Sequence, residues 1–187
     1  MIDFDPTWAL TKAGNAHSTV ADAYGELSWP SHDNLPTPAA GQPYGRVLLL
    51  ECQPAQLPAA ELVLIRWRPG QRCAIHDHGG GHGFVYVLQG EVHNEAWPDS
   101  ESLTSGVPGQ KTSWSAGSSI PIGSQCVHSM MARADGPTIS LHLYIGASTA
   151  MTIYDPESMR RFLVSNNHGA WLPDDSEILE ELSWTKK

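Results

Sequence analysis

Short runs in which apolar and polar residues alternate recur along most of the chain after residue 43. Alternation with a period of two places successive side chains on opposite faces and is typical of β-strands. The strands that this pattern predicts cover residues 45–51, 61–67, 72–78, 84–88, 91–97, 111–114, 126–132, 138–144, 151–154 and 159–164. Turn residues separate them, and the turns at Gln89-Gly90 and Asp155-Pro156-Glu157 are expected to close hairpins.

The two ends of the chain depart from this pattern. Scattered apolar residues between Trp8 and Leu27 predict one or two short helices, and a proline-rich connector follows them. The tail from Pro173 to Leu182 predicts a short helix that begins at an aspartate. We therefore expect an N-terminal segment, residues 1–43, packed on a β-barrel with a C-terminal tail, residues 44–187. The number and spacing of the strands predict an all-β fold, a jelly-roll barrel or an antiparallel sandwich, with short N-terminal helices.

Length, charge and cysteine content narrow the classes of function. The chain has 187 residues, which suits one globular domain. Its net charge of −9 and the lack of a basic cluster argue against nucleic acid or anionic membranes as partners. No apolar run is long enough to span a bilayer, and Met1 to Pro6 show no secretory signal. An odd number of cysteines at irregular spacing gives no disulfide framework, so we expect a reducing cytoplasm. We expect a monomer or small homo-oligomer.

The candidate chemistry begins with two histidines. His76 and His78 are separated by one residue in a run that alternates like a strand, so they point to the same face and their imidazoles can converge on one metal ion. A His-x-His pair also arises by chance, and its meaning depends on the surrounding residues. Neutral imidazole suits iron, zinc, copper and nickel alike, so the ligand type does not identify the metal.

The residues around this pair resemble the first motif of the cupins, in which two glycines flank His-x-His and a glutamate at fixed spacing. Gly70 and Gly90 stand in register with that motif, whereas Gly83 occupies the position of the glutamate. The segment from Ile120 to Gly123, before His128, resembles the second motif in kind only, because its Pro-x-Gly lies further from the histidine. The resemblance implies a cupin jelly-roll β-barrel without a carboxylate ligand. The metal ligands that it implies are His76, His78 and His128.

The region from Tyr44 to about Asp155 resembles, more narrowly, the cysteine dioxygenase branch of the thiol dioxygenases within the cupins. A Ser-x-His-x-Tyr motif at Ser140, His142 and Tyr144 follows the third metal histidine, as it does in that family. These three residues alternate along one predicted strand and therefore share a face. Serine can fix the tautomer of the imidazole, and the imidazole can orient the phenol. The resemblance implies that all three are catalytic, with the phenol hydrogen-bonding to a ligand of the metal.

The same resemblance points to the residues that bind substrate. Arg46, in the motif Tyr44-Gly45-Arg46, stands where arginine-type members of the family grip the substrate carboxylate, and Tyr44 is expected beside it. A guanidinium offers a planar fork that matches a carboxylate. Family members that prefer 3-mercaptopropionate tend to carry glutamine here, so Arg46 favours cysteine. Other arginines that could bind a carboxylate are Arg66, Arg68, Arg72 and Arg133.

Gly83 also stands where animal cysteine dioxygenases carry a cysteine that forms a thioether with the active-site tyrosine. Glycine cannot form this bond, so Tyr144 is expected to remain an unmodified phenol. Cys126 shares a face with His128, but we expect Cys126 and Cys73 to be packed residues rather than ligands. His82 matches a family position without an assigned role. The histidines expected at the surface are His17, His32, His93 and His168.

The sequence therefore predicts a non-haem Fe(II) dioxygenase that adds both atoms of O2 to the sulfur of L-cysteine and forms cysteine sulfinate. Its partners would be a small thiol and O2. One alternative is a dioxygenase of another mercapto acid, such as 3-mercaptopropionate or mercaptosuccinate. Another is a non-catalytic cupin module that binds zinc or nickel. Manganese oxidases and sugar isomerases of the cupin class usually keep the glutamate that Gly83 replaces.

Overall fold

The computed structural model describes residues 35–52, 59–146 and 149–185. The chain separates into two compact units, Met1–Leu35 and Pro36–Lys187. The helices expected between Trp8 and Leu27 lie outside the described residues, so the expected role of residues 1–43 stays a prediction. The fold described below is that of the second unit.

Within the described residues, β-strands predominate. The strands are β1 (Tyr44–Cys52), β2 (Ala60–Trp67), β3 (Ile75–His76), β4 (His82–Gln89), β5 (Glu91–Trp97), β6 (Gln110–Ser115), β7 (Ser119–Ile122), β8 (Val127–Ala132), β9 (Thr138–Ile145), β10 (Ala150–Asp155), β11 (Arg160–Ser165) and β12 (Ile178–Ser183). A helix, α3 (Ser100–Thr104), and a 3₁₀-helix, η3 (Asp175–Glu177), interrupt them. None of the described helices has the length and apolar character that crossing a membrane requires.

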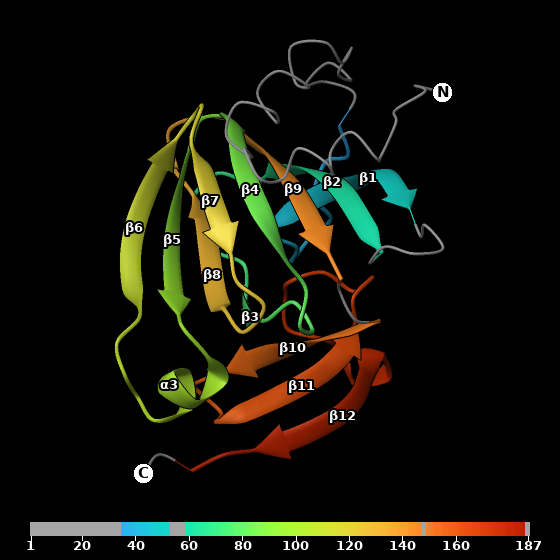
Figure 1. The fold of residues 1–187 in the computed structure, drawn as a ribbon, viewed down its shortest axis with the longest axis vertical. Helices are drawn as coiled ribbons and strands as arrows, with labels where there is room; N and C mark the ends of the chain where they lie inside the picture. The colour runs from blue at the N-terminus through green and yellow to red at the C-terminus, as the bar shows by residue number, and fades with distance from the viewer. Residues whose placement is uncertain (1–34, 53–58, 147–148, 186–187) are drawn as a thin grey trace. The chain divides into compact units, whose positions relative to one another are not determined.

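The strands form two sheets in which the neighbouring strands run antiparallel. The first sheet has the order β1-β2-β9-β4-β7, and the second has the order β12-β11-β10-β3-β8-β5-β6. In Figure 1, β10, β11 and β12 lie across the lower part of the view, below the strands of the first sheet. The expected all-β class and jelly-roll architecture are confirmed.

Side chains from both sheets meet in a shared hydrophobic cluster. Burial alternates along β4, where Val85 and Val87 are buried and Tyr86 between them is half-buried. Both valines pack in the same cluster as Val92 of β5 and Met130 of β8. Burying one such side chain stabilises the fold by about 1.5–3 kcal/mol, so the inward rows of the two sheets hold the barrel together.

The expected hairpin about Gly90 is wrong. β4 belongs to the first sheet and β5 to the second, so the turn passes the chain from one sheet to the other. Gly90 has a φ of +76°, and a Cβ there would lie 2.5 Å from Oγ1 of Thr138. Only glycine suits this close, left-handed turn. The hairpin between β10 and β11 is confirmed, since Asp155 pairs with Arg160 across the turn.

The expected helix in the C-terminal tail is also wrong in most of its length. Only η3 is helical, and the residues after it form β12, which pairs with β11 from Ser183 to Ile178. β12 is the edge of its sheet. The charged Glu180 and Glu181 suit an exposed edge, because charge there opposes pairing with another chain.

Candidate functional site

Three histidines lie together where β3 meets β8. His76 of β3 and His128 of β8 are direct partners across the antiparallel ladder, and His78 follows β3 on the same side. Their ring centroids are 4.7–5.0 Å apart, and the ligand nitrogens all lie within 4.8 Å of one another. All three residues are buried. The structure thus brings together the three residues expected to hold a metal.

Hydrogen bonds orient two of these imidazoles. Nδ1 of His76 lies 2.9 Å from the carbonyl oxygen of Ala74, and Nδ1 of His128 lies 3.0 Å from Oδ1 of Asn94. Since both oxygens are acceptors, each Nδ1 donates and each Nε2 keeps its lone pair for a metal. Asn94 could not be identified from the sequence, because its position beside His128 depends on the pairing of β5 with β8.

His78 is the strongest indication that the group fits a metal ion. Both of its ring nitrogens are buried and have no hydrogen-bond partner among the described residues. An unpaired buried polar group costs about 1–3 kcal/mol, and a bound cation would remove that cost. Burial lowers the pKa of His76, His78 and His128, so all three favour the neutral form that binds a metal.

Asp77, which separates the two histidines, faces away from them and anchors the loop. Its Oδ1 accepts the backbone N–H of Gly79 at 3.0 Å and of Thr152 at 2.9 Å, and its Oδ2 accepts the hydroxyl of Tyr154 at 3.2 Å. These bonds tie the histidine segment to β10. The sequence does not indicate this role for Asp77. Two of its donors, Thr152 and Tyr154, lie on β10, 75 and 77 residues further along the chain.

Ser140, His142 and Tyr144 form the expected chain of hydrogen bonds on β9. Oγ of Ser140 lies 2.8 Å from Nε2 of His142, and Nδ1 of His142 lies 2.7 Å from the hydroxyl of Tyr144. The indole N–H of Trp67 also donates to Oγ of Ser140, at 2.8 Å. Trp67 extends the chain to a residue that the sequence analysis did not single out.

The indole favours one order of donors along this chain, because it can only donate. Oγ of Ser140 accepts from Trp67, which leaves its own hydrogen for Nε2 of His142. Burial lowers the pKa of His142 to about 3, so the ring is neutral, and in this order its hydrogen lies on Nδ1 and goes to the oxygen of Tyr144. The hydroxyl hydrogen of Tyr144 is then free to donate elsewhere.

Tyr144 lies against the histidine group. Its ring stacks on that of His78 with the centroids 5.1 Å apart. Burial raises the pKa of its phenol, so the hydroxyl keeps its hydrogen. A neutral donor is therefore held beside the position that a metal would occupy.

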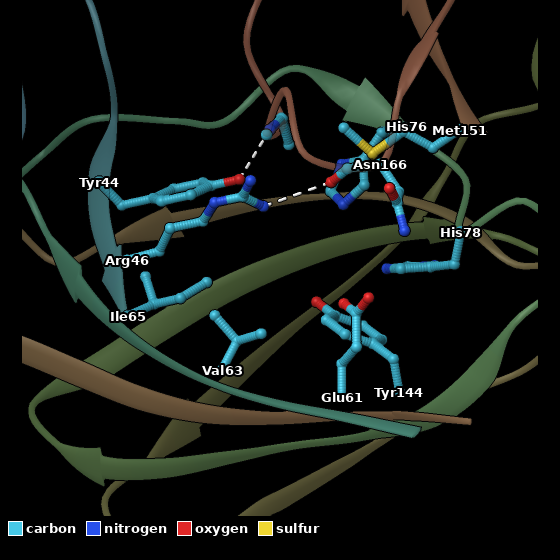
Figure 2. Close-up of a pocket in the computed structure, with 12 residues that line it drawn as sticks. Tyr44, Arg46, Glu61, Val63, Ile65, His76, His78, Tyr144, Met151 and Asn166 are labelled. Atoms are coloured by element: carbon cyan, nitrogen blue, oxygen red, sulfur yellow. Dashed lines mark hydrogen bonds between the residues drawn. The ribbon is translucent and has the colours of Figure 1, made fainter. Parts of the chain in front are cut away.

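A small cavity of about 60 Å³ opens beside these residues. Figure 2 shows the side chains around it, with Arg46 on one side and Tyr144 and His78 on the other. The lining residues are Tyr44, Arg46, Glu61, Val63, Ile65, His76, His78, Tyr144, Met151, Asn166, Gly169 and Ala170. The structure therefore places both expected substrate-binding residues, Arg46 and Tyr44, in one pocket with two of the histidines and the phenol.

The segment after β11 holds Arg46 and Tyr44 in place. The guanidinium of Arg46 donates to the backbone oxygens of Asn166 and Asn167, and the hydroxyl of Tyr44 accepts the N–H of Ala170 at 2.6 Å. Two carbonyl acceptors orient the guanidinium without neutralising its charge. None of the rival arginines Arg66, Arg68, Arg72 and Arg133 lines this pocket.

Glu61 is a pocket residue that the sequence analysis missed. It begins the inward row of β2, which continues through Val63 and Ile65 to Trp67. The middle of β2 is buried on both faces, so its alternation alone does not show which row faces inward. The one indication in the sequence is that Glu61 is a charged residue near the start of a mostly apolar strand.

Gly83 is required by the backbone. It is the direct partner of Tyr144 across the ladder between β4 and β9. A Cβ at this position would lie 1.8 Å from the carbonyl oxygen of Leu143. The strands thus approach each other too closely for any side chain here.

The other cysteines and histidines whose side chains are described do not line the pocket, and His17 and His32 lie outside the described residues. Cys73 is buried in the core and accepts the N–H of Met130, as expected of a packed residue. Cys126 is half-buried and does not line the pocket, and His82 is exposed. His168 is not at the surface, since its side chain is 4% exposed and bonds to Glu177 at 3.0 Å.

Comparison with known proteins agrees with these features. The sequence profile of the family called cysteine dioxygenase type I matches residues 56–157, more than half of the chain. An uncharacterized protein with a double-stranded β-helix domain from Klebsiella pneumoniae is 22% identical, with a TM-score of 0.50 over 70% of this chain and 99% of that chain. Two oxalate oxidase structures, one in complex with the substrate analogue glycolate, are 12% identical with TM-scores of 0.52. They cover 72% and 80% of this chain and 69% and 73% of their own.

At these identities the solved structures show the fold alone, a double-stranded β-helix that here carries three histidines placed to hold a metal ion. The matched sequence profile, which covers more than half of the chain, identifies the family. The chain belongs to the cysteine dioxygenase type I family.

Proposed function

We propose that this protein is an Fe(II)-dependent thiol dioxygenase that converts L-cysteine to cysteine sulfinate in the cytoplasm. The observation that carries the proposal is one pocket lined by two histidines of the metal group, the phenol of Tyr144 and the guanidinium of Arg46. Membership of the cysteine dioxygenase type I family supports the same reaction class. In that reaction a thiol and O2 combine, and both oxygen atoms end on sulfur.

The metal ligands in this proposal are His76, His78 and His128. Three neutral nitrogens and no carboxylate suit iron(II), as they suit other divalent first-row metals. When bound, iron(II) would supply the redox chemistry that activates O2 beside the thiol sulfur. The chain's own part is to hold the reactants next to each other, which makes their reaction effectively intramolecular.

Arg46 binds the substrate carboxylate in this proposal, with Tyr44 beside it. Its contacts with Asn166 and Asn167 fix the plane of the guanidinium before substrate arrives, so less side-chain entropy is lost on binding. Val63 and Ile65 line the cavity with apolar surface and exclude water, which strengthens a bond between opposite charges.

Tyr144 is the catalytic hydrogen-bond donor. In the order of donors favoured by Trp67, its oxygen accepts from His142, so its hydroxyl hydrogen is available to the reacting atoms. Ser140 and His142 act through it as positioning residues. A donor that is fixed before the reaction costs little reorganisation when charge develops on oxygen.

Oxygen uptake by anaerobically Fe(II)-loaded protein tests the proposal, with L-cysteine and 3-mercaptopropionate offered separately and product mass read in the same samples. We expect faster uptake with cysteine and a product heavier by two oxygen atoms. Arg46→Ala should raise KM for cysteine about tenfold or more. The matched control is Arg133→Ala, whose guanidinium pairs with Glu91 and Asp135 outside the pocket.

Other outcomes would separate the alternatives. Faster uptake with 3-mercaptopropionate, or with mercaptosuccinate in a parallel assay, would keep the reaction class and replace the substrate. Purified protein that holds zinc or nickel and consumes no O2 with any thiol after iron loading would indicate a non-catalytic metal-binding module. An unchanged KM in Arg46→Ala would remove Arg46 from the substrate site.

A further inference from the structure

Glu61 gives the pocket a negative charge that has no role in the proposed function. Resting on that function, we propose that the carboxylate of Glu61 binds the amino group of the substrate, so that the site selects α-amino thiols over thiols that lack an amine.

The position of Glu61 is fixed by the sheet. It is the direct partner of Tyr144 across the ladder between β2 and β9. Side chains of such partners stand on the same face, with their Cβ atoms about 4.5–5.5 Å apart. Glu61 therefore points into the barrel beside the phenol, as Figure 2 shows.

Glu61 has no partner that would explain a structural role. Its side chain is half-buried, and it forms no hydrogen bond or ion pair with any described residue. The acidic residues nearby that do have structural roles are bonded, as Asp77 is to β10. A partly desolvated carboxylate without a partner loses hydration without compensation, so a cationic ligand would stabilise it.

Glu61 and Arg46 do not neutralise each other. Arg46 lies opposite Ile65, four residues from Glu61 along β2, which corresponds to about 13 Å of strand. Val63 and Ile65 lie between them on the cavity wall, as Figure 2 shows. The pocket thus has a cation at one end, an anion at the other and an apolar wall between them.

A free α-amino acid carries the matching pair of groups. With its carboxylate on Arg46 and its amino group toward Glu61, the thiol side chain of cysteine is left for the histidines. 3-Mercaptopropionate has no group for Glu61, and mercaptosuccinate would place a second carboxylate near it. Like charges in a confined site repel, so Glu61 disfavours the dianionic thiol as well as favouring the amino thiol.

Glu51 provides a matched control. It is the direct partner of Glu61 on β1 and lines an adjoining, larger cavity of about 370 Å³, but it is exposed and does not line the small pocket. Replacing Glu51 with glutamine removes a negative charge near the pocket and leaves the proposed contact intact. If negative charge acts only in a general way, Glu51→Gln and Glu61→Gln should weaken cysteine binding alike. If Glu61 makes a specific contact, only Glu61→Gln should weaken it.

Calorimetric titration of Fe(II)-loaded protein without O2 tests the proposal, because it measures binding in the absence of turnover. The variants are Glu61→Gln and Glu51→Gln, and the ligands are L-cysteine and 3-mercaptopropionate. We expect Glu61→Gln to weaken cysteine binding about tenfold or more and to change 3-mercaptopropionate binding by no more than about twofold. Glu51→Gln should leave the preference between the two thiols as it is in the wild-type protein.

Equal losses for both thiols in Glu61→Gln, no loss for cysteine, or no cysteine binding by the wild-type protein would overturn the proposal. Oxygen uptake by the wild-type protein is measured separately. If uptake is absent while the expected binding pattern is present, the proposed dioxygenase function fails and the assignment of Glu61 stands.

Discussion

Trp67 and Ser140 are joined by a hydrogen bond of 2.8 Å that links β2 to β9 deep in the barrel. Both residues are buried, and the indole has no alternative acceptor role. Because the indole donates, this bond favours a serine hydroxyl that points at His142, and the same order of donors continues to Tyr144. A residue of the core therefore influences where the phenol's hydrogen is directed.

Replacing Trp67 with Phe should disturb catalysis more than binding. The serine hydroxyl would be free to rotate, and we expect kcat for cysteine to fall about fivefold or more while KM stays nearly constant. Steady-state oxygen uptake measures both constants. Trp114→Phe is the control, because that indole bonds to Thr112 within β6. An equal fall in kcat for the two variants would mean that the bond to Ser140 has no special role.

Asn94 should matter for metal affinity through His128. Substituting Asn94 by Ala removes the acceptor of the Nδ1 hydrogen, so the imidazole loses its fixed orientation. We expect affinity for Fe(II) or Zn(II) to fall about 10–100-fold, measured by competition with a chelator. Ser113→Ala, which removes the partner of the exposed His93, should leave affinity unchanged.

Asp77 should couple stability to metal binding. Asp77→Ala leaves two backbone N–H groups and the Tyr154 hydroxyl without their acceptor, at a cost of about 1–3 kcal/mol in the free energy of unfolding. It should also weaken metal binding, since the histidine loop loses its tie to β10. Asp155→Ala removes three hydrogen bonds in an exposed turn and should leave metal affinity intact. Denaturant unfolding measures the loss of stability in both variants, and metal titration measures the loss of metal affinity. Unchanged metal affinity in Asp77→Ala would contradict this role.

The metal-free protein should lose stability in mild acid. Burial lowers the native pKa of His142 from 6.5 to about 3, so between these values the unfolded chain binds a proton that the native chain does not. Stability is then fully present above about pH 6.5 and falls as the pH drops toward 3. Thermal unfolding between about pH 7.5 and 4.5 measures the slope, which should be shallower in His142→Gln.

What the sequence could predict depended on local geometry. His76 and His78 share a face because strands alternate, and the same argument orders Ser140, His142 and Tyr144. Residues whose roles depend on strand pairing were not accessible in this way. Asn94 meets His128 only because β5 lies beside β8, and Glu61 meets Tyr144 only because β2 lies beside β9.

The strand expected over residues 72–78 is only Ile75–His76, and β7 was not expected. The wrong hairpin at Gly90 and the wrong helix in the tail have one origin. A glycine turn between two apolar strands looks alike whether the strands pair with each other or belong to different sheets, as β4 and β5 do. In the tail, the segment from Ile178 to Ser183 has helix-forming residues, but pairing with β11 outweighs that preference. Only the tertiary structure decides either case.

The tight approach of β4 to β9 at Gly83 has a consequence for how the family's variants could arise. A single codon change to cysteine or glutamate would introduce a side chain into the space of a neighbouring backbone carbonyl. The covalent tyrosine of the animal proteins and the carboxylate of other cupins are therefore not one mutational step away from this chain. Adjustment of the strand spacing would have to come first, so the phenol here is expected to act without any covalent maturation.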